Sequence, residues 1–168
     1  MSNLFLLGLP GSGKSTLGSQ LAKHFGLHFI DLDVEIEKTA GQSIEQIFNK
    51  FGEPYFRKIE QNTLKEVVGD ESGFVMAVGG GTPCYNDNMQ LLNKSGQTIF
   101  LDVPTDVLCE RLWNDVTLTR PLLLGLSADG LKEKIEGLSN ERQKFYKEAK
   151  LRIQGSDISI NDLLRVVK

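Results

Sequence analysis

The segment from Gly8 to Ser15 constrains this chain more than any other. It reads Gly-Leu-Pro-Gly-Ser-Gly-Lys-Ser, follows the apolar residues 4–7, and fits the spacing GxxxxGK(S/T) of loops that wrap the phosphates of a nucleotide. Small residues let successive backbone N–H groups converge on a polyphosphate, and a helix that starts at the loop points its positive end at the same charge. Apolar residues recur at helical spacing from the loop to Gly26. The sequence therefore predicts a strand, a phosphate-binding loop and a helix, in that order.

Individual residues of this loop have distinct predicted roles. We expect Lys14 to reach the outer phosphates and to act in catalysis, and Ser15 to bind Mg²⁺. The alternative is a plain glycine turn without a ligand, which the flanking strand and helix make less favourable. The nucleotide-binding residues predicted in the loop are Gly11, Ser12, Gly13, Lys14, Ser15 and Thr16.

The composition is that of one globular domain, predicted to span residues 1–168. The chain is 40% hydrophobic and 24% charged, with a net charge of -3, which argues against nucleic acid or an anionic membrane as its main partner. Its longest apolar runs are too short to cross a bilayer, so we expect a cytoplasmic protein. We also expect it to be a monomer. Two cysteines, Cys84 and Cys109, are too few for a disulfide framework and fit a reducing compartment, and neither is assigned a catalytic role.

Short apolar segments alternate with longer segments of helical period, which is typical of a parallel sheet covered on both faces. The predicted strands are residues 4–7, 28–30, 74–78, 98–101 and 151–153. Start signals predict further helices at Ser43, with Gln46 completing a capping box, and at Pro54, Pro104 and Ser127. The fold class is therefore an α/β sandwich of three layers. Ligands of such sheets collect beyond the carboxyl ends of the strands, so the residues there are candidates for the site.

Two carboxylates follow the second predicted strand. If the strand continued, it would include both Asp31 and Asp33, which lie two residues apart. We assign Asp31 to Mg²⁺ through water, and Asp33 to the attacking hydroxyl of an acceptor, because phosphoryl transfer requires both charge neutralisation and an oriented nucleophile. The alternative is that Asp33 only caps the helix that follows.

Three glycines follow the third predicted strand. Gly79, Gly80 and Gly81 offer backbone N–H groups with no side chains to keep a small polar molecule away. A flexible turn explains three glycines equally well, but their place at a strand end favours a binding role.

Two arginines break the pattern around them. Arg142 lies on a helical stripe of apolar residues, and a buried guanidinium requires an anion because it cannot shed its proton. Snorkelling at a cleft edge is the alternative. Arg57 precedes Glu60 by three residues, so the carboxylate either fixes the guanidinium for a ligand or forms an exposed ion pair. The stripe of Arg142 comprises Leu131, Ile135, Leu138, Arg142, Phe145 and Ala149.

Residues 112–126 lack a clear period and are predicted to form a mobile lid over the nucleotide, with an ordinary surface loop as the alternative. Arg120 in this segment would swing onto the transferring phosphate and stabilise its charge. Arg111 would stack on adenine, although a cation late in a helix is also explained by the helix dipole.

Taken together, the motifs resemble those of the shikimate kinases, in the same order and at similar spacing over about residues 3–153. They are the phosphate loop, Asp31-x-Asp33, Phe56-Arg-x-x-Glu60, Gly79-Gly-Gly81, Arg120-Pro-Leu-Leu123 and Glu141-Arg-x-x-x-Tyr146. The resemblance implies ATP-dependent phosphorylation of the 3-hydroxyl of shikimate, in chorismate and aromatic amino acid biosynthesis. It also implies a five-stranded parallel sheet of the P-loop NTPase type, with a closing lid and an acceptor-binding region at about residues 32–62.

The resemblance further implies residue roles. Arg57 and Arg142 would grip the shikimate carboxylate, Asp33 and Gly80 would meet its hydroxyls, and Arg120 would be the lid residue near the phosphates. ATP would be the co-substrate and Mg²⁺ the metal.

Three other functions compete with this interpretation. A sibling kinase acting on gluconate or a nucleoside monophosphate would use the same phosphate loop with another acceptor pocket. A GTP-dependent switch would need a guanine-reading aspartate, which the run Asn93-Lys-Ser-Gly96 lacks. A module that only binds ATP would not need the acceptor-side carboxylate Asp33.

Overall fold

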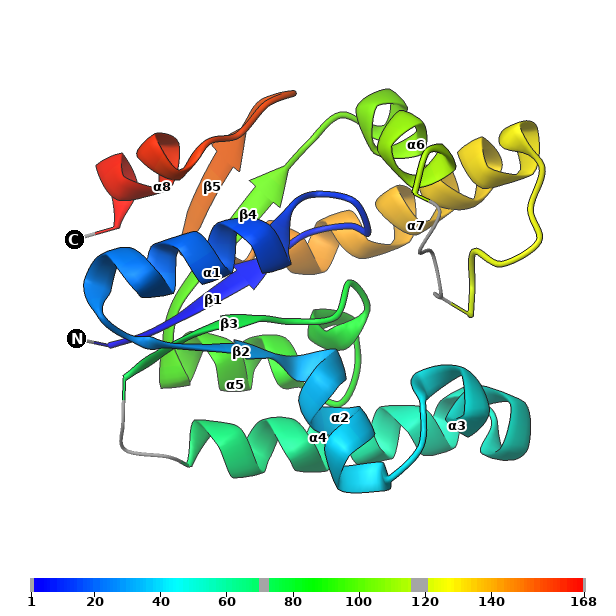
Figure 1. Ribbon diagram of the computed structural model, residues 1–168, viewed down its shortest axis with the longest axis horizontal. Coiled ribbons are helices and arrows are strands. Elements are labelled where there is room, and N and C mark those ends of the chain that lie inside the picture. The colour runs from blue at the N-terminus through cyan, green and yellow to red at the C-terminus, as the bar shows by residue number, and fades with distance from the viewer. Residues whose placement is uncertain (1, 70–72, 116–120, 168) are drawn as a thin grey trace.

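A computed structural model describes residues 2–69, 73–115 and 121–167, and its core is one sheet of five parallel strands. The strands are β1 (Asn3–Leu7), β2 (His28–Asp31), β3 (Phe74–Ala77), β4 (Gly96–Asp102) and β5 (Leu151–Gln154). Their order in the sheet is β2-β3-β1-β4-β5, with every neighbouring pair parallel (Figure 1). All five predicted strands are confirmed, each to within a residue or two.

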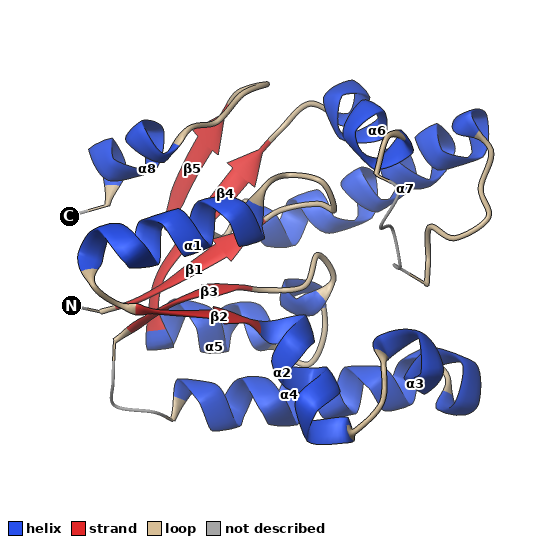
Figure 2. Cartoon of the chain, viewed as in Figure 1, coloured by secondary structure: helices blue, strands red, loops and turns tan. Residues whose placement is uncertain are grey.

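Side chains of the central strand alternate between two apolar layers, because successive residues of a strand point to opposite faces. Leu4 and Leu6 pack on one face with residues of α1 (Lys14–Phe25) and α8 (Ile160–Val166). Phe5 and Leu7 pack on the other face with the remaining helices. This arrangement confirms the three-layer α/β sandwich (Figure 2).

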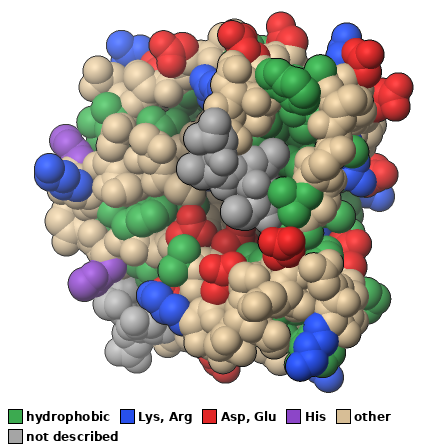
Figure 3. All heavy atoms as spheres, turned by 45° about the vertical axis from the view of Figure 1, so that its right-hand side comes forward, with side chains coloured by type: hydrophobic (Ala, Val, Ile, Leu, Met, Phe, Trp, Pro, Cys, Tyr) green, Lys and Arg blue, Asp and Glu red, His purple; other side chains and the backbone are tan. Residues whose placement is uncertain are grey.

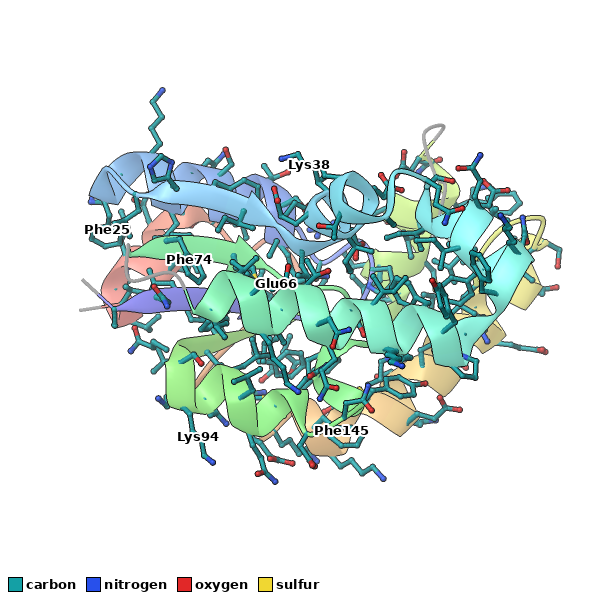
Figure 4. The ribbon with its side chains drawn as sticks, turned by 90° about the horizontal axis from the view of Figure 1, so that it is seen from below. Phe25, Lys38, Glu66, Phe74, Lys94 and Phe145 are labelled. Carbon is teal, nitrogen blue, oxygen red and sulfur yellow. The ribbon has the colours of Figure 1, made fainter. Side chains whose placement is uncertain are left out.

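The second face carries most of the helical residues. Its helices are α2 (Leu32–Ala40), α3 (Ile44–Phe51), α4 (Glu53–Val68), α5 (Asn88–Ser95), α6 (Thr105–Trp113) and α7 (Ala128–Tyr146), with a short 3₁₀ turn, η1 (Thr82–Cys84). Viewed from this side, α4 and α5 cross in front of the strands, and α3 continues beyond the sheet (Figure 4). None of the helices in the described ranges is both long and apolar enough to cross a membrane.

Local signals place most helix ends. Ser43 and Gln46 form the predicted capping box at the start of α3, and Ser127 caps α7. Gly26 ends α1 in the left-handed conformation, which a residue without a Cβ adopts at little cost. Pro104 is the N-cap of α6, while α4 begins one residue before Pro54.

The parallel sheet brings the carboxyl ends of its strands to one edge. The phosphate loop follows β1, Asp31 is the last residue of β2, and Gly79 and the two glycines after it follow β3. Residues far apart in the sequence therefore meet at this edge, as expected for ligand sites in such sheets.

Candidate active site

The phosphate loop presents the uncapped N-terminus of α1 to solvent. Gly13 precedes the helix with φ 91°, a conformation that favours glycine, and no side chain caps the first turn. This turn also contains no acidic residue. Its backbone N–H groups and the positive end of the helix dipole therefore remain available to an anion.

Lys14 is held at the loop by backbone oxygens. Its Nζ donates hydrogen bonds to the carbonyls of Gly8 at 2.9 Å and Leu9 at 3.1 Å, and to Ser12 Oγ at 3.4 Å. Lys14 and Ser12 are both buried. The ammonium thus lies within the loop, where the predicted contact with the outer phosphates requires it.

Ser15 and Asp31 are in direct contact. Ser15 Oγ donates to Asp31 Oδ2 at 2.7 Å, and Asp31 Oδ1 accepts the backbone N–H of Asp33 at 3.1 Å. Asp31, rather than Asp33, is therefore the N-cap of α2, because β2 stops at Asp31 and the helix begins at Leu32. The extended chain considered for Asp33 is replaced by a helical first turn.

The Ser15–Asp31 pair fits a magnesium site. Both residues offer oxygen, the ligand that this hard cation prefers, and Mg²⁺ in kinases is usually held by one or two protein groups together with phosphates and water. The described residues contain no cluster of three or more His, Cys, Asp or Glu side chains that could hold a metal ion. The magnesium site at Ser15 and Asp31 stays a prediction.

A pocket of about 590 Å³ opens beside the loop and brings together all the predicted acceptor-side residues. Those lining it are Asp33, Arg57, Gly79, Gly80, Gly81 and Arg142, and Asp31, predicted for the metal, lines it as well. Pro10 links it to the phosphate loop, and Asp33 stands in the first turn of α2. Acidic side chains gather around the hollow on this face of the molecule (Figure 3).

Arg57 lies in this pocket between two carboxylates of its own helix. Its Nη1 donates to Glu60 Oε1 at 2.9 Å, and its Nε and Nη2 donate to Glu53 Oε1 at 3.3 and 3.1 Å. Arg57 and Glu60 are only 7% and 1% exposed. The pair is buried, so the exposed ion pair considered as an alternative is wrong.

Burial and pairing oppose each other in these two groups. Burial lowers the pKa of Arg57, but attraction to Glu60 and hydrogen bonds to both carboxylates outweigh it, and the net pKa is raised. Burial also raises the pKa of Glu60, which Arg57 and the hydroxyl of Thr82 offset in part. The guanidinium therefore stays charged at any pH at which the protein is folded.

Arg142 is equally buried, at 7% exposed, and it also lines the pocket. Among the described residues, no carboxylate oxygen lies within 4 Å of its guanidinium. Of the two arginines of the pocket, Arg142 is thus the one with no acid of the described chain against it, and an anion placed in the pocket would meet its charge.

The predicted stripe around Arg142 needs one correction. The buried residues of α7 are Leu131, Ile135, Leu138, Arg142 and Tyr146. Tyr146 takes the place expected for Phe145 because the next inward position after Arg142 is four residues on. Ala149 lies beyond the end of the helix.

The three glycines make room for charged groups of the protein itself. A Cβ on Gly79 would lie 3.2 Å from Asp33 Oδ1 and 3.4 Å from Glu60 Oε2. One on Gly80 would lie 2.8 Å from Arg142 Nη1, and one on Gly81 would lie 2.5 Å from Arg57 Nη2. Neither a turn nor a ligand is needed to explain these residues, although they also line the pocket.

Arg111 braces the phosphate loop. It lies in the last turn of α6, donates from Nη1 to the carbonyl of Gly11 at 3.0 Å, and donates from Nη2 to the carbonyl of Ser156 at 2.8 Å. The guanidinium therefore joins the loop to the segment after β5. Its predicted stacking on adenine stays a prediction.

The predicted lid falls only partly within the described residues. Arg120 lies outside them, so its place in the site stays a prediction. The described part of the segment contributes Asp115, Pro121, Leu122 and Leu123 to the lining of the pocket.

Several contacts at and next to the pocket were not predicted from the sequence. Phe48 and Phe56 form an apolar wall, with ring centroids 4.8 Å apart, and only their helical spacing hinted at it. The hydroxyl of Tyr146 donates to the carbonyl of Gly80 at 2.6 Å, a contact across 66 residues that no local pattern reveals.

Comparison with known proteins identifies the family of the chain. The family model described as shikimate kinase matches residues 10–167. A shikimate kinase of Parabacteroides distasonis is 42% identical over 151 residues, which are 90% of this chain and 86% of that protein.

Two solved structures share the whole fold. Shikimate kinase from Bacteroides thetaiotaomicron matches with a TM-score of 0.91 at 35% identity, covering 98% of this chain and 96% of that chain. The enzyme from Acinetobacter baumannii, solved in complex with shikimate, matches with a TM-score of 0.88 at 32% identity, covering 98% and 89%.

A gluconokinase from Sinorhizobium meliloti is more distant, with a TM-score of 0.57 at 17% identity, and covers 98% of this chain and 87% of its own. That likeness is one of fold alone, so it does not support gluconate as the acceptor. The match along nearly all of the sequence leads to one assignment. The chain belongs to the shikimate kinase family.

Proposed function

We propose that this protein transfers the γ-phosphoryl group of ATP to the 3-hydroxyl of shikimate. The observation that carries the proposal is the guanidinium of Arg142, buried in a pocket beside the phosphate loop with no carboxylate of the described chain against it. A buried cation of this kind suits a ligand that brings its own carboxylate. Shikimate is such a ligand, a ring that carries one carboxylate and several hydroxyls.

The acceptor is bound through its carboxylate and activated at its attacking hydroxyl. Arg142 and Arg57 bind the carboxylate, and the backbone of Gly79, Gly80 and Gly81 lies along the ring. Asp33, on the opposite helix, accepts a hydrogen bond from the attacking hydroxyl and takes its proton as the new P–O bond forms. The reaction therefore depends on holding the hydroxyl in line with the phosphate, which these contacts provide.

The nucleotide end relies on the phosphate loop. Gly11, Gly13 and the first turn of α1, including Thr16, donate backbone N–H groups to the phosphates, and Lys14 stabilises the charge on the oxygens of the transferred group. Ser12 shapes the loop, since its own N–H donates to the carbonyl of Leu9 at 3.2 Å. Ser15 and, through water, Asp31 would hold Mg²⁺, which neutralises charge on the β- and γ-phosphates when it is bound.

Two further elements complete the proposal. Residues 112–126 act as a lid that excludes water and brings Arg120 to the phosphates, and Arg111 packs against adenine. The enzyme works as a cytoplasmic monomer.

A coupled assay for ADP release tests the acceptor. Shikimate, gluconate and AMP are offered separately at equal concentration with Mg²⁺ and ATP, and turnover is expected with shikimate alone. The control is ATP without an acceptor, which measures idle hydrolysis. Turnover with gluconate or AMP that matched the rate with shikimate would contradict the proposal.

A further inference from the structure

A single short segment touches both carboxylates that hold Arg57. It consists of η1 and the next residue, Tyr85, and it follows directly after Gly81. Thr82 Oγ1 donates to Glu60 Oε2 at 2.7 Å, and Tyr85 Oη donates to Glu53 Oε1 at 3.2 Å. Each carboxylate thus binds Arg57 while it also accepts a hydroxyl from this segment.

Tyr85 also contacts the guanidinium itself. The Cζ atom of Arg57 lies 4.1 Å from the centroid of the Tyr85 ring, within the range of a cation–π interaction. Because the ring covers one face and the carboxylates take the edges, the guanidinium has few other orientations open to it.

The segment and the residue after it, Asn86, are held by further hydrogen bonds that do not involve the side chain of Arg57. Asn88 Nδ2 donates to the carbonyl of Thr82 at 3.0 Å, and Gln61 Nε2 donates to the carbonyl of Asn86 at 2.9 Å. Asn86 Nδ2 in turn donates to the backbone carbonyl of Arg57 at 3.2 Å. The segment is therefore a fixed support, with contacts to α4 on both sides of the Arg57 side chain.

The donors of Arg57 show why its orientation matters. Nη1 and Nη2 each carry two N–H groups, and each nitrogen donates one of them to a carboxylate of the protein. Among the described residues, nothing accepts the second N–H of either nitrogen. These two remaining donors are the ones an acceptor carboxylate would use, and their direction is set by Glu53 and Glu60.

We propose that Thr82 and Tyr85 are positioning residues for Arg57 and thereby set the affinity for the acceptor's carboxylate. The inference rests on the proposed function, since it concerns the same pocket. Without the Thr82 hydroxyl, the buried Oε2 of Glu60 loses its partner, and a buried acceptor atom left unpaired is costly. Glu60 then relieves the loss by turning, and Arg57 turns with it.

The test compares two variants with matched controls. Thr82→Val removes the hydroxyl at nearly constant volume, and Thr63→Val removes another buried hydroxyl, on α4, that forms no hydrogen bond to Arg57 or Glu60. Tyr85→Phe is matched by Tyr55→Phe, a similarly exposed tyrosine on the same helix as Arg57. Steady-state kinetics give KM for shikimate, KM for ATP and kcat, and calorimetry gives shikimate binding without turnover.

We expect Thr82→Val to raise KM for shikimate about tenfold and Tyr85→Phe about threefold, with KM for ATP within about twofold of wild type. Thr82→Ser, which keeps the hydroxyl, should restore the wild-type KM. Calorimetry should show the same loss of affinity. If Thr82→Val fails to fold, Thr82→Ser and the exposed Tyr85→Phe still decide the matter.

Two outcomes overturn the inference. One is a wild-type KM for shikimate in both Thr82→Val and Tyr85→Phe, and the other is an equal rise in both KM values, as a general loss of structure would give. The proposed function fails by a different result, because wild-type protein would then release no ADP with shikimate. The two failures are therefore distinguishable.

Discussion

Replacing Gly81 by alanine tests whether glycine is needed there because an arginine side chain of the protein occupies the space that a Cβ would fill. The backbone of Gly81 has φ -89° and ψ -13°, which alanine adopts without strain. Reduced freedom of the unfolded chain would even stabilise such a variant by about 0.4–1 kcal/mol. Any loss must therefore come from the space that the new methyl group occupies.

That space is taken by Arg57. The added Cβ would lie 2.5 Å from Nη2, 2.8 Å from Nη1 and 2.9 Å from Cζ. Since Glu53 and Glu60 hold the guanidinium, it cannot swing aside without breaking buried hydrogen bonds. Overpacking of this kind costs about 1–3 kcal/mol, so we expect a net loss of about 1–2 kcal/mol in the free energy of unfolding.

Thermal unfolding and steady-state kinetics measure the two consequences of Gly81→Ala. A loss of that size lowers Tm by roughly 2–8 °C in a chain of this length, and the displaced guanidinium should raise KM for shikimate at least tenfold, at about 1.4 kcal/mol per factor of ten. The control is Gly137→Ala in α7, where a Cβ meets nothing within 4 Å and Tm should rise instead. A Gly81→Ala variant with an unchanged or higher Tm and wild-type KM would refute the reasoning.

Three other predictions concern single side chains. Arg142→Ala should raise KM for shikimate about 100-fold and leave KM for ATP unchanged, because it deletes a charge-assisted contact with the substrate carboxylate. A KM for shikimate equal to that of wild type would contradict this role of Arg142. Asp33→Asn should lower kcat at least about 100-fold with little change in either KM, and near-normal turnover would exclude it as the base. Burial raises the pKa of the Cys84 thiol to about 11 from its ordinary 9.0. In a Cys109→Ser variant, alkylation of Cys84 should therefore become about tenfold faster per pH unit from pH 8 to 10. A rate that levels off near pH 9 would refute the raised pKa. Because the folded pKa is the higher one, this thiol's contribution to stability is present below pH 9 and lost between about pH 9 and 11.

The parts of the fold that follow from the sequence are those with a local cause. The phosphate loop, the five strands and the helices starting at Ser43 and Ser127 each carry their signal within a few residues. Helix α8 was also predictable, because Ser159 and Asp162 form a capping box like that of Ser43. Helix α5 was not, since its N-cap, Asp87, lies in the left-handed region with no side-chain cap.

In the candidate site, too, some features follow from local sequence and others depend on residues far apart in the chain. Periodicity alone indicated that Arg142 faces inward, and the structure buries it. The contacts of Thr82 with Glu60 and of Tyr146 with Gly80 join residues 22 and 66 positions apart, so no window of sequence contains both partners. The reason for the three glycines escaped prediction on the same grounds, because the arginines that need the space come from other helices.

The charges of the pocket argue for recognition by placed contacts rather than by a general positive field. Among the described residues that line it, the cations are Arg57 and Arg142, and the acids outnumber them: Asp31, Asp33, Glu37, Glu45, Glu60 and Asp115. Glu53 and Glu60 already neutralise Arg57, so Arg142 is the pocket cation that has no acid of the described residues against it. A neutral polyol gains less from that guanidinium than a carboxylate does, and a second anionic group on the ligand would lie among the carboxylates of the pocket. The arrangement therefore suits a ligand with one carboxylate and an otherwise neutral, hydroxylated body.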